Sequence, residues 1–283
     1  MPGVLLSLVL NDSDSGITLE QQERVIKTLG SYEAELAERD IRNTSIGCLY
    51  LDPEGRFTVG KRIPVIQLFD SSFRGPWASI QEFISAPALY WLRQFELDPN
   101  AWVKLYARYT KDVVDVDLMI DFYKLIVDLS ARIEDGHSPH YGIVHADWDA
   151  RNMLVDPDDF GRVTAILDWD HAEVRPAWLC DRDFNAIFSY SKDKSQYDAL
   201  LNLKYDTFEA LAPRTTELLK KYFHYNALTQ AAWFPFYGGR GLECVLEYAE
   251  LLHDYWPKDD VAGPQLIQAF LPKVRSGREG SLK

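Results

Sequence analysis

The segment from residue 152 to residue 169 most constrains the fold, because it has the pattern of a β-hairpin. The apolar run behind Asn152 ends in a cluster of turn-forming residues at 156–161, and a second apolar run at 163–167 leads to Asp168. Short apolar runs separated by such clusters are typical of antiparallel strands. Antiparallel pairing brings Asn152 and Asp168 to the same end of the hairpin.

A polar loop precedes this hairpin. Residues 141–144 predict a short buried strand, and His145, Ala146 and Asp147 follow it directly. The next strand begins just behind Asn152, so the loop between the strands must hold Asp147 and Asn152 toward one space.

The residue types in this loop suit phosphoryl transfer from a nucleotide. Asp147 is the candidate base for a substrate hydroxyl, and His145 is a second catalytic candidate. Asn152 and Asp168 are candidate ligands of Mg²⁺ and, through it, of ATP. Hard cations such as Mg²⁺ prefer carboxylate, amide and water oxygens.

A purely structural interpretation competes with this one. Asp147 and Asp149 could satisfy loop amides, and Asp168 and Asp170 could belong to turns. The joint order of these residues, with an apolar strand on either side, favours a kinase-type catalytic loop followed by a metal loop.

These residues resemble the aminoglycoside phosphotransferase and choline kinase group of the protein-kinase-like fold. That group writes its catalytic loop H-G-D-x4-N and its metal motif I-D-W/F-[ED]. The corresponding segments are 145–152, with Ala146 in place of Gly, and 167–170. Ordinary protein kinases fit less well, because the chain has His-Ala-Asp for His-Arg-Asp and Asp-Trp-Asp for Asp-Phe-Gly. Three further segments look like parts of the helical lobe of the phosphotransferases: 46–50, 57–60 and 74–77.

The resemblance implies an α+β, predominantly helical fold, the C-terminal lobe of the kinase-like fold with a small catalytic β-hairpin. The lobe would cover residues 1–270, with a hinge remnant at 1–10 and a frayed basic tail at 271–283. ATP and Mg²⁺ are the implied cofactors. A small-molecule acceptor would bind among the helices behind the metal motif. The candidate acidic groups there, for which helix capping and surface charge are the alternatives, are Asp181, Asp183, Glu243 and Glu247.

The residues with which such enzymes cover their nucleotide are not evident in the sequence. No glycine-rich turn with a phosphate-binding Lys and its partner Glu precedes Asp147. Lys61 lies in a Gly-Lys-Arg-Ile-Pro context that indicates a solvated loop, and the glycines at 238–241 indicate a turn between helices. We therefore expect the N-terminal lobe to be missing from this chain, which alone would bind Mg-ATP weakly and be inactive.

The composition limits which binding partners and which cellular location we expect for this protein. A formal net charge of −13 does not suit contacts with a phosphate backbone, so we expect no nucleic-acid partner, and it is compatible with a cationic acceptor. Three scattered cysteines favour a reducing, cytoplasmic location. The apolar run at 4–10 is too short for a membrane span and lacks signal-peptide features. If a lobe is missing, this run is also a candidate surface for self-association.

Helical periodicity covers most of the remaining chain. A capping box at Thr18 starts one helix, and Ser79 starts another that Pro87 should break or kink. The apolar stripe at 118–133 predicts the helix that leads into the catalytic loop. Further helices are expected at about 178–190, 196–211, 214–227, 242–255 and 264–270.

Three function classes remain open at this point. The first is an ATP- and Mg²⁺-dependent phosphotransferase acting on a small-molecule hydroxyl, which the loops favour. The second is a non-catalytic, pseudokinase-like binding protein or truncated gene product. The third is a metal-dependent hydrolase that would use His145, Asp147 and Asp168. The acceptor is not identified by the sequence.

Overall fold

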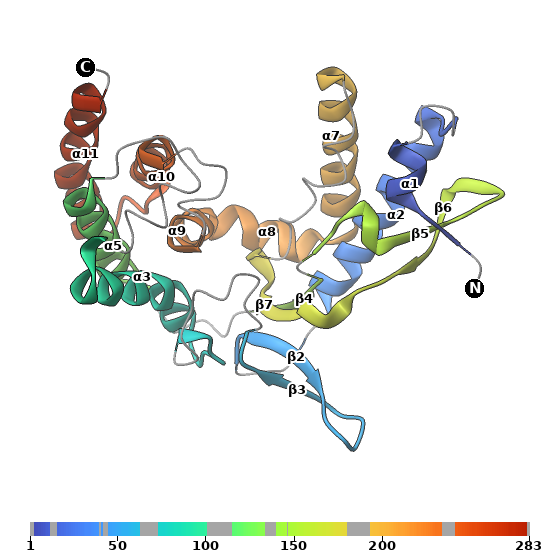
Figure 1. Ribbon diagram of the computed structural model, residues 1–283, viewed down its shortest axis with the longest axis horizontal. Coiled ribbons are helices and arrows are strands. Elements are labelled where there is room, and N and C mark those ends of the chain that lie inside the picture. Colours follow the sequence, from blue (N-terminus) through green and yellow to red (C-terminus); the bar gives the residue numbers. More distant parts are fainter. Residues whose placement is uncertain are drawn as a thin grey trace. The chain divides into compact units, whose positions relative to one another are not determined.

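The fold is α+β and predominantly helical, as expected (Figure 1). The computed structural model describes residues 3–11, 16–39, 41, 45–62, 73–100, 115–133, 140–145, 147–179, 193–233 and 241–281, with the side chains of 241–243 and 277–281 left out. The chain forms two compact units, each built from two separate stretches. The first unit comprises Met1–Ile63 and Pro139–Lys221, and the second comprises Pro64–Ser138 and Tyr222–Lys283.

The first unit contains the expected hairpin as part of a three-stranded antiparallel sheet. Strands β5 (Met153–Asp156) and β6 (Asp159–Ile166) pair with one another, and β1 (Val4–Leu5) pairs with the other side of β5. Met153 lies opposite Ile166, so the residues just outside this pair meet at one end of the hairpin. The prediction that Asn152 and Asp168 lie at the same end of a hairpin is therefore confirmed. The turn is shorter than expected, because β6 already begins at Asp159.

A second sheet in this unit was only partly foreseen. It has the order β3-β2-β7-β4 and is antiparallel throughout. Strand β4 (Tyr141–Val144) was predicted, whereas β2 (Gly47–Leu51), β3 (Phe57–Gly60) and β7 (Glu173–Pro176) were not. The segments 46–50 and 57–60, which look like parts of a predominantly helical lobe in the sequence, therefore lie in or overlap strands. For β2 and β3, the turn residues Asp52, Pro53 and Gly55 between two short apolar runs were the signal that could have revealed a hairpin.

Helix α2 (Leu19–Glu38) covers the hairpin. It begins at the predicted capping box, in which the Thr18 hydroxyl accepts from the Gln21 N–H and the Gln21 side chain accepts from the Thr18 N–H. Its buried apolar face packs with α1 (Leu6–Asn11), β5 and α7 (Lys194–Leu211) in one core, which continues toward α8 (Pro213–Lys221). That core contains Leu6, Val9, Val25, Ile26, Leu29, Trp148, Ala150, Met153, Val155 and Leu200.

The second unit is helical in its described part. It comprises α3 (Ile80–Leu97), α5 (Val116–Ser130), α9 (Phe223–Trp233), α10 (Gly241–Tyr255) and α11 (Ala262–Ser281). The stripe at 118–133 is indeed a helix, α5, but it belongs to this unit, and the helix that packs on β4 and β6 is α2.

Three helix boundaries differ from the expectation. Pro87 lies inside α3 without ending it. The helix expected at 214–227 is two helices, α8 and α9. The last helix continues past 270 to Ser281, because Leu271 and Val274 are buried and extend its apolar face. The helix expected at 178–190 falls mostly on residues outside the described part of the chain.

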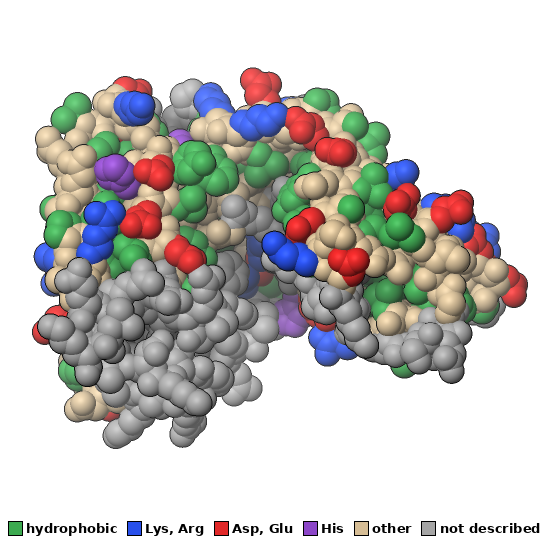
Figure 2. Space-filling view, turned by 90° about the horizontal axis from the view of Figure 1, so that it is seen from above, with side chains coloured by type: hydrophobic (Ala, Val, Ile, Leu, Met, Phe, Trp, Pro, Cys, Tyr) green, Lys and Arg blue, Asp and Glu red, His purple; other side chains and the backbone are tan. Residues whose placement is uncertain are grey.

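On the face shown in Figure 2, acidic and basic side chains of the described residues are interspersed with apolar ones. No helix in the described part of the chain has the length and apolar content needed to cross a membrane.

Candidate active site

The catalytic and metal loops meet because two strand pairs converge on them. Strand β4 ends at Val144, which lies opposite Glu173, the first residue of β7. The loop behind Val144 therefore starts at the sheet edge where the metal loop enters β7. At the hairpin, the Leu167 N–H donates to the Asn152 carbonyl over 2.8 Å, which joins the end of one loop to the start of the other.

The catalytic loop is anchored by its own apolar and charged side chains. Trp148 and Ala150 are buried in the core that α1 and α2 share with the hairpin. Asp149 caps the short 3₁₀ turn η2 (Ala150–Asn152) by accepting from the Arg151 N–H, and its carboxylate also accepts two bonds from the Arg151 guanidinium, at 2.9 and 3.0 Å. The Arg151 guanidinium hydrogen-bonds to Asp149 and lowers the pKa of that carboxyl despite its partial burial. Asp149 therefore has the structural role of satisfying loop amides, as one of the two interpretations of the sequence proposed.

Asn152 holds Asp147 directly. Its amide NH₂ donates to the Asp147 carbonyl over 3.1 Å and to the carboxylate oxygen Oδ2 over 3.0 Å. These two bonds fix the amide so that its own oxygen, Oδ1, faces away from Asp147. Among the described residues, nothing hydrogen-bonds to Oδ1 of Asn152 or to Oδ1 of Asp147, and both side chains are half-buried.

Asp168 is the one described residue other than glycine with a positive φ. Its backbone is left-handed, with φ 60° and ψ 60°, at the start of the 3₁₀ turn η3 (Trp169–His171). A left-handed non-glycine residue costs of the order of 1–3 kcal/mol, and such strain concentrates at functional sites. The Asp168 side chain caps nothing and is exposed, so its carboxylate has no protein partner in the described part of the chain.

The buried side chain of His145 connects the catalytic loop to the metal loop. Its side chain is 0% exposed, its Nε2–H donates to the Leu167 carbonyl over 2.7 Å, and its Nδ1 accepts a longer bond, 3.4 Å, from the Asp147 N–H. Burial lowers the pKa of His145 below its usual value, although the Leu167 carbonyl and the charges of Asp147 and Asp168 oppose this shift. A neutral imidazole with both nitrogens bonded to backbone is suited to bracing the loops rather than to carrying protons.

Two tryptophans enclose this imidazole. The ring of Trp148 lies 5.0 Å from it, and that of Trp169 lies 4.7 Å away, edge to face. Trp169 is 40% exposed, and its indole N–H donates to the Ile166 carbonyl over 3.0 Å. The metal loop is therefore fixed at Trp169 as well as at Leu167.

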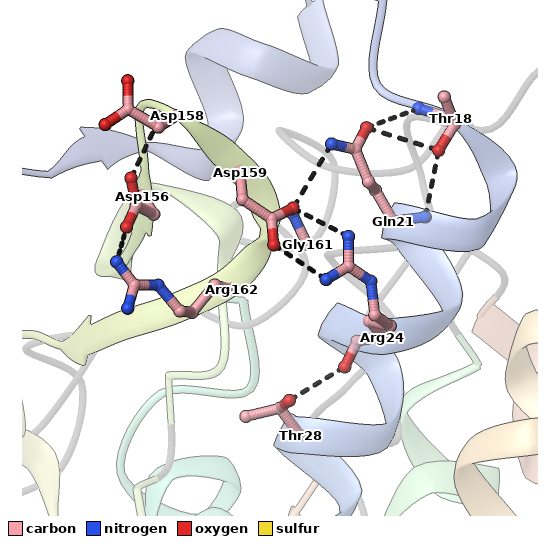
Figure 3. A network of polar contacts seen from close by, with 9 residues as sticks. All are labelled: Thr18, Gln21, Arg24, Thr28, Asp156, Asp158, Asp159, Gly161 and Arg162. Atoms are coloured by element: carbon pink, nitrogen blue, oxygen red, sulfur yellow. Dashed lines mark hydrogen bonds and ion pairs between the residues drawn. The ribbon is translucent and has the colours of Figure 1, made fainter.

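The other end of the hairpin is tied to α2 by a polar network (Figure 3). Arg24 donates two bonds of 2.7 Å to the Asp159 carboxylate, and the Gly161 N–H donates to the same group over 3.1 Å. Asp156 likewise pairs with Arg162 and accepts from the Asp158 N–H over 2.8 Å. This network positions the hairpin whose opposite end carries Asn152 and Asp168.

The side-chain oxygens of Asn152 and Asp168 are of the chemical type that binds magnesium. Asn152 Oδ1 and the Asp168 carboxylate are hard oxygen donors at the same end of the hairpin, and neither has a partner among the described residues. No group of three or more His, Cys, Asp or Glu side chains that could hold a metal occurs among the described residues. Such an ion would therefore take its remaining ligands from water and phosphate, as Mg²⁺ commonly does.

Of the four candidate acceptor residues, only Glu247 has a described side chain. Asp181 and Asp183 lie outside the described residues, as does the side chain of Glu243. Glu247 is an exposed residue of α10, in the second unit. Ala146, the small residue of the loop motif, is also outside the described part.

Comparison with known families agrees with these loops. Residues 61–179 match the family described as the phosphotransferase enzyme family, abbreviated APH. The matched stretch contains both loops and all four site residues that the sequence singled out. This part of the chain is therefore similar to the phosphotransferase enzyme family. No curated protein matches the chain.

Proposed function

We propose that this protein transfers a phosphoryl group from Mg-ATP to a hydroxyl of a small molecule. The observation that carries the proposal is the contrast between two aspartates near one end of the hairpin, Asp147 and Asp168. Asp147 is held in place by Asn152. The backbone of Asp168 is in a strained conformation, and its carboxylate has no partner among the described residues. The family match supports phosphoryl transfer as the class of reaction.

Asp147 acts as the base or orienter of the acceptor hydroxyl. One carboxylate oxygen accepts from the Asn152 amide, and the other is left for the hydroxyl. An accepted proton would reside on that second oxygen while the hydroxyl oxygen attacks the transferred phosphorus. His145 holds the backbone of Asp147 and Leu167 and stays neutral in this role.

Asn152 and Asp168 hold the magnesium ion. Mg²⁺, when bound, neutralises charge on the phosphates during transfer. The two protein groups differ in what they contribute. Asn152 supplies a neutral oxygen whose direction is set by Asp147, whereas Asp168 supplies the charge that attracts the cation.

The base of the nucleotide lies on the outer face of the three-stranded sheet. Leu5 pairs with Leu154 and Leu154 with Ala165, so these three half-buried side chains share one face. Their strand neighbours Met153 and Val155 are fully buried on the opposite face. An apolar face that continues directly from Asn152 is suited to a flat heterocycle. The sequence did not indicate this face, because β5 is too short to show which of its residues alternate between faces until its partner strands are known.

The acceptor is a small and preferably cationic molecule. Asp168 and Asp170 are exposed, Asp147 lies in the same loop system, and the whole chain has a net charge of −13. A cytoplasmic location suits both the ATP requirement and the buried Cys48 and Cys244, which are in no disulfide among the described residues. Self-association through α1, where Leu8 is 64% exposed, remains a prediction.

The decisive experiment compares Asp147→Ala with Asp158→Ala. Asp158 is an exposed Asp at the far end of the same hairpin, and its side chain points away from the network in Figure 3. Loss of a positioned base lowers turnover by about 10²–10⁴-fold, so we expect that loss for Asp147→Ala with Mg-ATP affinity retained, and no change for Asp158→Ala. Phosphate transfer to a panel of amino alcohols and sugars is measured, with Mg-ATP binding by calorimetry, on this chain supplied with the N-terminal lobe that the sequence analysis expects it to lack. Mg-ATP binding without transfer to any acceptor would favour the non-catalytic binding protein, and metal binding without nucleotide would favour the hydrolase.

A further inference from the structure

Glu173 is a buried carboxylate that neither loop motif includes. It is the first residue of β7 and lies between two strands, opposite Cys48 of β2 on one side and Val144 of β4 on the other. The residue is 2% exposed. A fully buried carboxylate is rare unless it is paired.

Two arginines share this carboxylate. Arg62, just behind β3, donates from Nε to Oε1 over 2.5 Å, and Arg175 donates from Nε to Oε2 over 2.6 Å. The Cys48 thiol lies 3.9 Å from Oε1. Burial opposes ionisation of Glu173, but the charges of Arg175 and Arg62 outweigh it and hold the pKa of the carboxyl below its ordinary value. The group is therefore an anion that ties β7 to the segment behind β3.

Its place in the sheet connects this ion cluster to both functional loops. Val144, its partner on β4, immediately precedes His145. Asp168 precedes Glu173 by only the turn η3 and Ala172, whose carbonyl accepts from the Leu49 N–H over 2.8 Å. A shift of Glu173 along or across the sheet would therefore move the start of the catalytic loop and the end of the metal loop together.

Stability alone is a weak reason for such a cluster, because burying charges costs about as much as their attraction returns. The same unit offers a comparison. Glu33 of α2 is 3% exposed and lies 3.0 Å from the buried ammonium of Lys204 on α7. That pair joins α2 to α7, two helices outside the catalytic and metal loops, so its effects should fall on stability.

We propose that Glu173, held by Arg62 and Arg175, is a positioning residue that sets the spacing of Asp147 and Asp168 for phosphoryl transfer. The inference rests on the proposed function for its kinetic consequence, but its structural consequence is measurable without any nucleotide.

The experiment compares Glu173→Gln with Glu33→Gln, the same change at two equally buried carboxylates of one unit. Amide hydrogen exchange is followed at Asn152 and Leu167, whose N–H groups bond within and between the loops, and in α7 as the internal reference. Because Glu173→Gln leaves two arginines with a neutral partner and could unfold the sheet, Arg62→Met is the second variant. It leaves the Glu173–Arg175 pair electrically balanced.

We expect Glu173→Gln and Arg62→Met to speed exchange at Asn152 and Leu167 by on the order of tenfold relative to α7, a change equivalent to one decade in the opening equilibrium. Glu33→Gln should speed exchange throughout the unit in equal proportion. In the active protein, Glu173→Gln and Arg62→Met should lower kcat and raise the Mg²⁺ concentration needed for half-maximal rate, while Glu33→Gln changes neither below its melting temperature.

Uniform acceleration in all three variants would overturn the proposal and leave Glu173 a stability residue. So would selective loop exchange with unchanged Mg²⁺ dependence in an active protein, because the loops would then move without consequence for the site. If the unaltered protein neither binds Mg-ATP nor transfers phosphate, the proposed function fails, whereas the exchange pattern still decides whether Glu173 positions the loops.

Discussion

Both ends of the β5–β6 hairpin carry aspartates, but the two ends differ in whether these carboxylates have partners. At the turn end, Asp156 and Asp159 each have an arginine partner, and Asp159 also accepts a backbone N–H. At the other end, Asp168 is exposed and without a protein partner among the described residues, in a left-handed backbone conformation. The carboxylates at the turn end thus have protein partners, whereas Asp168 at the other end has none within the described part of the chain.

The difference separates structural from functional carboxylates. A carboxylate paired with a guanidinium stabilises the fold and has little capacity left for a ligand. A carboxylate that is kept in a strained conformation without a partner contributes nothing visible to the fold, and a ligand is the simplest group to complete it. The contrast therefore assigns anchoring to the turn end and supports the proposal that the site end binds the metal.

Within the hairpin itself, the largest effect is expected at the site end, at Asp168. Asp168→Ala should weaken Mg-ATP binding by roughly ten- to a hundredfold, since one charge-assisted contact contributes about 1.5–3 kcal/mol. Asp168→Gly should lose the same affinity while leaving stability unchanged or slightly higher, because glycine adopts positive φ without strain. Calorimetry and thermal melting measure the two effects. Unchanged Mg-ATP affinity in both variants would remove Asp168 from the metal site.

The next effect concerns His145, which braces the site end. His145→Asn should cost about 1–3 kcal/mol of stability by unpairing the Leu167 carbonyl. It should also lower turnover without removing a titration near neutral pH from the pH–rate profile. Loss of that titration together with the imidazole would show that His145 is a general base instead.

The lowered pKa of His145 also sets the direction of a stability change. Since the folded state holds the imidazole neutral, its contribution is fully present above about pH 6.5, the ordinary value, and is lost as the pH falls toward the folded pKa. Chemical denaturation of the unaltered protein and His145→Asn across this window measures the contribution. His224, whose pKa burial lowers to about 4, adds a dependence of the same sign that both proteins share.

A smaller effect is expected at the turn end, from Asp159. The Arg24 guanidinium and the Gly161 N–H lower the pKa of Asp159 to about 2 from 3.8. The stabilisation is therefore present above pH 3.8 and is lost as the pH falls toward 2. Asp159→Asn should lower the denaturation midpoint at pH 6 and differ less from the unaltered protein at pH 2.5, with Mg-ATP binding retained. A stability difference independent of pH would contradict the ion pair, and Asp158→Asn is the control.

The smallest expected effect is that of Gly161→Ala. An added Cβ would come within 2.6 Å of the Arg24 guanidinium, which is the movable end of a flexible side chain. The arginine can shift, so the melting temperature should fall slightly and kinetic constants should stay the same. A large loss of activity would mean that the turn end controls the site more directly than the comparison between the two ends implies.

Local sequence determined the parts of this protein whose structure depends on neighbours along the chain. The capping box at Thr18, the strand before His145 and the β5–β6 hairpin were all predictable, because their signals are periodicity, turn chemistry and short-range hydrogen bonding. The family relationship followed from the ordered loop motifs, and residues 61–179 match that family.

Only the tertiary structure decided the rest. The sequence did not indicate that Glu173 would lie between Cys48 and Val144, that Arg62 would reach it, or that α2 would cover the hairpin. Nor did it indicate which aspartates would find partners. Arg24 and Asp159 are far apart in sequence, and their pairing exists only because α2 and β6 pack together. A carboxylate's partners are set by long-range packing, which single-residue patterns do not encode, and at this hairpin those partners separate an anchor from a candidate metal ligand.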